Sequence, residues 1–416
     1  MVIRTSWDAM FPIAWDGFRM YNITMAPKST DNGDRAMGRA PLAVKKVDWG
    51  NIAFFTITTF FAMAVTPFYI IRSGISISEV LLFVFYVFGT SLSITLGYHR
   101  LFAHATFKAN ALVRFMVLFF GAAAFQQSAL RWASQHRDHH RYVDTDQDPY
   151  SIRKGFFYAH MGWLIFWEHP YHYENVKDLR KSRLILHQHR FYTPWAVTSG
   201  ILLPVGIGAL TGHMVGAFLL SVCARLTFVY HGTWCINSVC HTFGKATYDI
   251  YSSAKDHWFA ALITNGEGYH NYHHHFPLDY RNGVRWYQWD PTKWIIASLS
   301  WLGFAWDLKK VSRFRILAAQ LAAEKQKIVD RLLERIENPS VLSFQEILES
   351  QYERLKHTLS VWEHSARDYQ ATLRQHMARH SEARREAALK SLAARQQFQE
   401  TLNQWKSIIQ LHFRTA

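Results

Sequence analysis

Four long apolar stretches constrain the fold of this chain more than any other feature. They cover residues 51–71, 77–98, 195–210 and 214–234. A helix needs about 20 mostly apolar residues to cross the hydrocarbon core of a bilayer, so each stretch is a candidate membrane span. Short turns at Arg72–Gly74 and Thr211–His213 join the stretches in two pairs. Each pair therefore predicts a hairpin that returns the chain to the side of the membrane from which it came.

Three histidine clusters lie close to these stretches. They are His99 with His104, His136 with His139 and His140, and His270 with His273 and His274. Residues three and four apart share one face of a helix, so a single turn can offer ligands to two metals. Chance is the alternative explanation, since the chain has 23 histidines, but two HxxHH patterns beside apolar segments argue against it. Imidazole suits iron, zinc, copper and nickel alike, so the clusters predict metal binding without naming the metal.

A fifth apolar stretch, residues 110–127, lies between the first two clusters. If it were a span, the clusters before and after it would lie on opposite sides of the membrane. Because a shared metal site requires the clusters to meet, we expect an interfacial or buried helix here instead.

Basic residues set the expected orientation. Lys and Arg are in excess in the segments that carry and flank the clusters, which by the positive-inside rule places the clusters and both chain ends in the cytoplasm. Residues 1–48 show no secretory signal pattern and predict a cytosolic tail. The net charge of +15 indicates attraction to membrane surfaces and phosphate groups, and we expect no nucleic-acid partner.

The last hundred residues have a different composition, rich in Ala, Leu, Gln, Arg and Glu. From Leu348 to Leu373 apolar residues follow alternating spacings of four and three, the pattern of a coiled-coil seam. The seam either packs back on the metal-bearing domain of its own chain, or serves homo-oligomerisation or the docking of a partner. The predicted fold is therefore all-α, with a tail (1–48), a four-helix transmembrane domain capped by a cytosolic helical domain that holds the metals (49–315), and a long helical extension (316–416).

Several motifs in about residues 48–315 carry a family resemblance. They read LGYHRLFAH at 96–104, HRDHH at 136–140 followed by DQDP at 146–149, GFFYAHMGW at 155–163, TWCINSVCH at 233–241 and GEGYHNYHH at 266–274. In motif, order and spacing this part resembles the membrane acyl-CoA desaturases of the stearoyl-CoA delta-9 type. The resemblance implies that a saturated acyl-CoA and O2 are converted to a cis-monounsaturated product, with a delta-9 double bond expected.

The resemblance also implies a di-iron centre held by histidines. Its ligands would be His99, His104, His136, His139, His140, His241, His270, His273 and His274, with Asn237 bound through a water. His241 belongs to none of the three clusters and is expected from the resemblance alone. Carboxylates often orient metal-bound imidazoles, and Asp144, Asp148 and Glu267 are candidates. His275 extends the third cluster, and we expect it to be a bystander.

The implied substrate site is a kinked apolar tunnel with a polar mouth. Trp132 and Trp234 match the tunnel, while Gln126, Gln127, Arg153 and Lys154 match contacts to the head group. Basic side chains there would pair with phosphates. Ser134–Gln135 replaces a basic–acidic pair that is typical of the animal enzymes. Acyl carrier protein and intact lipid therefore remain open as acyl donors.

Electrons must come from outside, because the chain has no haem-binding HPGG, no GxGxxG and no cysteine cluster. We expect cytochrome b5, a ferredoxin or a rubredoxin with its NAD(P)H reductase. The departures from the animal pattern and the added helices favour a bacterial inner membrane over endoplasmic reticulum. Two other functions stay open: a membrane di-iron hydroxylase of fatty acids or alkanes, and a metal-binding transporter or scaffold.

Overall fold

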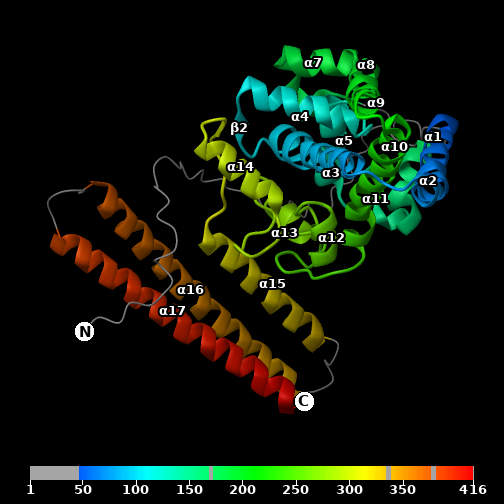
Figure 1. The fold of residues 1–416 in the computed structure, drawn as a ribbon. Helices are drawn as coiled ribbons and strands as arrows, with labels where there is room; N and C mark the ends of the chain where they lie inside the picture. Colours follow the sequence, from blue (N-terminus) through cyan, green and yellow to red (C-terminus); the bar gives the residue numbers. More distant parts are fainter. Residues whose placement is uncertain (1–45, 168–171, 334–338, 376–380, 416) are drawn as a thin grey trace. The chain divides into compact units, whose positions relative to one another are not determined.

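A computed structural model describes residues 46–167, 172–333, 339–375 and 381–415. The chain divides into two compact units (Figure 1). The first comprises the described residues up to Lys310 except 246–251, and the second comprises 246–251 and the described residues from Val311 onward. The predicted all-α fold is confirmed. Strands occur in the described part as two antiparallel pairs, β1 (Lys46–Val47) with β3 (Phe166–Trp167) and β2 (Lys108–Ala109) with β4 (Ala305–Trp306).

Within the described residues, four continuous helices are long and apolar enough to cross a membrane. The first runs over Trp49–Ser73 and includes α1 (Trp49–Phe60) and α2 (Thr66–Ser73), and the second runs over Ile77–Ala103 and consists of α3 (Ile77–Leu92) and η2 (Ser93–Ala103). The third runs over Tyr192–Leu210 and includes α8 (Tyr192–Val197) and α9 (Leu203–Leu210). The fourth runs over Met214–His241 and includes α10 (Met214–Ala217) and α11 (Arg225–Ser238). The second and fourth continue past the predicted ends at 98 and 234. Those extensions carry His99 and His241.

Local sequence explains the first hairpin. Gly74 ends α2 with φ of 73°, a left-handed conformation that favours glycine. Ser76 then accepts a hydrogen bond from the Glu79 backbone N–H, while Glu79 accepts one from that of Ser76. This reciprocal cap starts α3 and turns the chain back toward the side from which α1 began.

The fifth apolar stretch forms α4 (Ala111–Ala123), which is too short to be a span. It packs with one face against η2 and leaves Leu112, Phe115 and Met116 exposed. The length of α4 therefore agrees with the expectation that this stretch is an interfacial or buried helix and not a membrane span.

Besides the short turns η4 (Tyr158–Gly162), η5 (Glu174–Val176) and η6 (Leu179–Lys181), seven other helices belong to the described metal-bearing part of the first unit. They are α5 (Ala129–Tyr142), α6 (Trp163–Ile165), α7 (Arg183–Arg190), α12 (Trp258–Ile263), α13 (His270–His275), α14 (Pro291–Trp301) and the short η3 (Ile152–Lys154). The core of this part consists of buried side chains from η2, α4, α5 and α14, among them Leu101, Leu118, Leu130 and Ile296.

The second unit consists mainly of α15 (Arg313–Leu333), α16 (Pro339–Gln375) and α17 (Ser381–Thr415), with α16 and α17 side by side (Figure 1). Leu348, Leu355 and Leu359 from the predicted seam are buried against apolar residues of α15 and α17. The seam thus has partners within its own unit. The homo-oligomer expected from it stays a prediction.

Candidate metal centre

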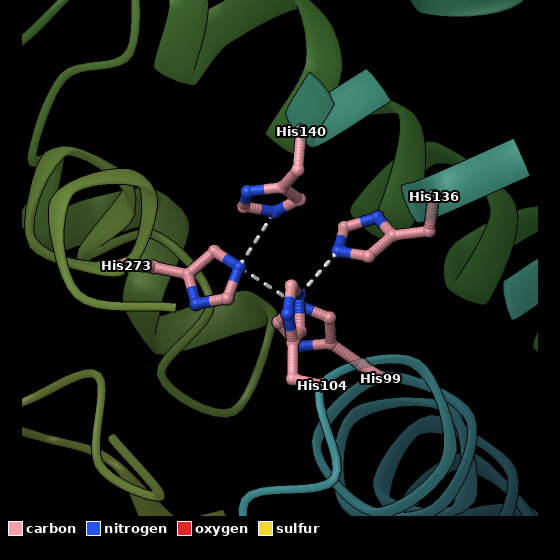
Figure 2. Close-up of side chains that lie close together, drawn as sticks. All are labelled: His99, His104, His136, His140 and His273. Carbon is pink, nitrogen blue, oxygen red and sulfur yellow. Dashed lines mark hydrogen bonds between the residues drawn. The ribbon is translucent and has the colours of Figure 1, made fainter. Parts of the chain in front are cut away.

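Nine histidines converge in two groups. The first, the five-histidine group, comprises His99, His104, His136, His140 and His273, and the second, the four-histidine group, comprises His139, His241, His270 and His274. Within each group one ring nitrogen from every member lies within 4.8 Å of the others. Figure 2 shows the rings of the first group pointing toward one another from three separate parts of the chain.

Two short helices supply members to both groups. Helix α5 gives His136 and His140, one turn apart, to the five-histidine group, and His139 to the other. Helix α13 gives His273 to the first group and its neighbours at 270 and 274 to the second. This is the division that HxxHH spacing predicts, because the first and last histidines share one face of a helix and the middle one points elsewhere.

The His99–His104 pair needs a different winding. On an α-helix, residues five apart point about 140° away from each other. From Ser93 to Ala103 the chain instead forms π-helical turns, and the backbone N–H of His104 donates to the carbonyl of His99 at 3.0 Å. A π-turn brings residues five apart back to one side. Both imidazoles can therefore join the same group.

All nine rings present Nε2 to the centre. The Nε2 atoms of His99 and His273 lie 2.9 Å apart, and those of His104 and His136 lie 2.8 Å apart. In the other group, Nε2 of His270 lies 3.0 Å from the Nε2 atoms of both His241 and His274. Lone pairs that converge this closely in a buried place are a metal-binding arrangement rather than a set of ordinary polar contacts.

The protonation state suits metal binding. Burial, followed by the charges of neighbouring histidines, holds the pKa of His136, His140, His270, His273 and His274 well below the usual value. These rings are therefore neutral at physiological pH, and neutral imidazole is the form that ligates metals.

Hydrogen-bonding groups hold three of the rings from behind. Nδ1 of His99 lies 2.8 Å from Oε2 of Glu267, and Nδ1 of His139 lies 2.9 Å from Oδ1 of Asp148. Nδ1 of His241 lies 2.6 Å from Oγ of Ser253, whose backbone N–H donates to Asp144. Such contacts fix ring orientation and leave Nε2 for the metal. The donor set thus fits two metal ions held by nitrogen alone, without a carboxylate between them.

Glu267 belongs to a buried charge network. Nη2 of Arg100 lies 3.0 Å from Oε1 of Glu267 and 3.0 Å from Oδ1 of Asp290. Nδ2 of Asn282 donates to Glu267, and the backbone N–H groups of Asn282 and Gly283 donate to Asp290. Burial alone would raise the pKa of Glu267, but His99 and Arg100 outweigh it and lower the pKa. The carboxylate that faces His99 is therefore ionised and firmly held.

Comparison with known proteins gives this centre a family context. A family model described as fatty acid desaturase matches residues 79–300, which is more than half of the chain and includes all nine histidines. The chain belongs to the fatty acid desaturase family. The match ends before Val311, where the main part of the second unit begins.

Named relatives agree with that family. "Probable acyl-CoA desaturase" of Schizosaccharomyces pombe is 40% identical over 275 residues, covering 64% of this chain and 57% of the relative. "Acyl-CoA desaturase 1" of Saccharomyces cerevisiae is 40% identical over 248 residues, covering 59% and 49%. Human "Stearoyl-CoA desaturase" is 36% identical over 249 residues, covering 56% and 67%. The matched part of this chain spans about half the length of the two yeast relatives.

A cavity reaches the histidines from between the spans. Four of the six residues expected at the substrate, together with Asn237, line it: Gln126, Gln127, Trp132 and Trp234. Arg153 and Lys154 lie on η3 and are not among the lining residues. Arg153 donates to the carbonyl of Asp144 at 2.8 Å, and the Lys154 ammonium lies over the Tyr158 ring. The structure therefore does not bring these two residues to the described cavity.

Sequence reasoning missed part of the site. Phe54 and Phe55 line the cavity from the first span, and Tyr150 lines it from the loop after α5. Ser253 and Asp290 support the ligands but carry no motif that marks them. The span aromatics could have been suspected only from their apolar setting. His275 lies outside both histidine groups, as expected, and its ring packs against Phe276.

Proposed function

We propose that this chain is an O2-dependent acyl-CoA desaturase that introduces a cis double bond, at the delta-9 position, into a saturated long-chain acyl group. One observation carries the proposal: nine Nε2 atoms converge beside an apolar cavity that opens between membrane-spanning helices. Relatives named acyl-CoA and stearoyl-CoA desaturases support it.

The metal of the proposal is iron, with two ions per chain. The five-histidine group would hold one, and the four-histidine group with Asn237, through a water, would hold the other. When bound, the iron pair supplies the activation of dioxygen with two electrons from an external donor. An all-nitrogen donor set leaves coordination positions open for dioxygen, which supports iron chemistry over a closed structural site.

The chain's own task is to place the acyl group. Trp234 stacks on Tyr230 with ring centroids 5.2 Å apart, and Phe55 meets both rings edge-on. Phe54 packs on the same Tyr230 ring. These aromatic side chains form a stiff apolar wall that excludes water. An acyl chain held against this wall would have neighbouring methylenes close to the metal position beside His99 and His136, which line the same cavity.

The polar end of the cavity would hold the head of the substrate. Gln126 donates to Oγ1 of Thr233 at 2.9 Å and keeps its Oε1 buried without a hydrogen-bond partner. Gln135 lines the same cavity, while Ser134 donates to the carbonyl of His172. This end is thus neutral where the animal enzymes have a charged pair. Acyl-CoA is the proposed donor, with Arg153 and Lys154, outside the described cavity, as proposed contacts to its phosphates. Acyl carrier protein and intact lipid are alternatives.

Location and electron supply complete the proposal. The histidines and both chain ends face the cytoplasm, where a separate cytochrome b5, ferredoxin or rubredoxin with an NAD(P)H reductase donates electrons. Departures at Ser134–Gln135 and the added helices favour a bacterial inner membrane, while the named relatives come from eukaryotes. Activity restored in a bacterial host by its ferredoxin or rubredoxin, without cytochrome b5, would support the bacterial alternative.

The test is expression of the chain in cells fed a deuterated saturated fatty acid, followed by mass spectrometry of the lipids. We expect a new deuterated monoene with the intact chain and none with His273→Ala. His275→Ala is the matched control, since it changes the same cluster at a position outside both histidine groups. A hydroxylated product would favour the hydroxylase. No product despite bound iron and a competent reductant would favour a non-enzymatic metal protein.

A further inference from the structure

Helix α12 exposes an unusual amount of apolar surface for six residues. Trp258 is 73% exposed, Phe259 52% and Leu262 47%, while Ala260 and Ala261 between them are buried. The helix follows the fourth span and precedes the third histidine cluster. An apolar patch of this kind on a short helix indicates a contact with another apolar phase or surface.

Two contacts set the depth of α12 relative to the spans. Nδ2 of Asn265, just after the helix, donates to Oγ of Ser91 in α3 at 2.7 Å. A Cβ placed on Gly232 in α11 would lie 3.8 Å from the carbonyl oxygen of Ile263. At about 1.5 Å per residue, Ser91 lies about 21 Å along the second span and Gly232 about 27 Å along the fourth. The hydrocarbon core is about 30 Å thick, so α12 ends near its cytosolic boundary.

The carboxyl-terminal end of α12 reaches the cavity. Ile263 and Thr264 line it together with Ser91 of the second span and Gly232 of the fourth. The end of the helix thus borders the cavity at a place where two spans flank it. Its outer side carries the three exposed side chains.

The same helix is tightly packed on the loop that carries the metal ligands. The backbone N–H of His257 donates to the carbonyl of Gly268 at 2.8 Å. A Cβ on Gly268 would lie 2.1 Å from the backbone nitrogen of Ala261, so only glycine allows this approach. Glu267 and His270 flank this glycine within two residues. Any movement of α12 would therefore reach the backbone that positions them.

We propose that α12 is seated in the membrane interface, with Trp258, Phe259 and Leu262 in contact with lipid, as a wall between the bilayer and the cavity. Its contacts beside the second and fourth spans put it at the depth of the membrane interface. Tryptophan at the interface and an apolar helix face beneath it are the composition that such a position favours. That the cavity behind the wall holds an acyl chain rests on the proposed function, whereas the lipid contact does not.

A spin label at position 262 tests the proposal. Leu262→Cys is made in a Cys235→Ser background, because Cys235 is half-buried and the other two cysteines are buried. The labelled full chain is placed in phosphatidylcholine nanodiscs, and collisions with O2, which favours lipid, and with a water-soluble nickel chelate are measured. We expect the label at 262 to favour O2 by several-fold. Lys177→Cys, at an exposed charged residue, is the control and should favour the chelate.

Preference for the chelate at 262 would overturn the proposal, and so would shielding from both reagents, which would indicate another protein surface such as a second copy of the chain. Phe259→Cys repeats the measurement on the same exposed face if the first variant does not fold. The bound-iron content of each labelled protein reports whether the centre is intact. Since no product is measured, failure of the desaturase proposal would leave this result unchanged.

Discussion

The two histidine groups use the same ligand chemistry but are supported in different ways. In the five-histidine group, His99 contacts Glu267, which forms an ion pair with the fully buried Arg100. Arg100 also forms an ion pair with Asp290. In the four-histidine group, His139 contacts Asp148 and His241 contacts the Ser253 hydroxyl, and both of these partners lie in loops. An ionised network in low dielectric resists distortion and is costly to break, whereas single hydrogen bonds from loops are cheaper to lose. The two groups should therefore differ in their response to matched changes.

Glu267→Gln should have the largest effect. The amide keeps the shape but removes the charge that faces His99 and Arg100 in a buried place. Breaking a buried ion pair costs about 3–5 kcal/mol. We expect loss of iron from the five-histidine group and a lower temperature of unfolding, measured by iron content and by thermal unfolding in detergent. Glu174→Gln, in an exposed pair with Lys177, should change neither. If Glu267→Gln keeps two irons and an unaltered unfolding temperature, the two histidine groups do not differ in how they are supported.

Asp148→Asn should have the next largest effect, confined to the four-histidine group. Asp148 also accepts a hydrogen bond from the Tyr150 backbone, so the amide retains part of its role. Loss of an orienting carboxylate typically costs about 10–100-fold in metal affinity or activity. Iron titration followed by Mössbauer spectroscopy should show one site weakened and the other unchanged. Equal weakening of both sites would mean that the groups do not behave separately.

Ser253→Ala should act on the same group more weakly. The hydroxyl at His241 is lost, but the backbone N–H at position 253 still donates to Asp144 and keeps the loop in place. A neutral hydrogen bond contributes about 0.5–1.5 kcal/mol, so we expect about a 10-fold loss of affinity at most. Ser253→Thr, which keeps a hydroxyl, should restore binding. If it does not, the serine acts through packing.

Tyr150→Phe should have the smallest effect. Its hydroxyl lies 3.3 Å from Nδ1 of His136, a long contact, while its ring packs on His139 with centroids 4.5 Å apart. Phenylalanine keeps the ring contact and removes only the hydroxyl. Iron affinity should fall by a few-fold at most, measured by the same titration. A loss as large as that of Asp148→Asn would show that His136 depends on this hydroxyl.

Much of the fold could be predicted from local pattern. Apolar stretches of sufficient length predict spans, because a bilayer sets the length that a helix needs. The stretch at 110–127 was correctly separated from them only by requiring that the clusters meet. The roles of individual residues as metal ligands and the division of the chain into domains stay predictions. His241 stands alone in sequence and would not have been suspected without the family resemblance, because a ligand that comes from the end of a span has no neighbouring histidine to mark it.

The sequence by itself determined which residues can share a helical face, and therefore that His136 and His140 lie in one group while His139 lies in the other. That follows from the helix repeat, which depends only on neighbours along the chain. Only the tertiary structure decided that His241 meets His270, that Glu267 backs His99, and that π-helical turns bring His104 to the same side as His99. Those arrangements depend on contacts between residues far apart in sequence, whose positions are set by packing of the whole unit.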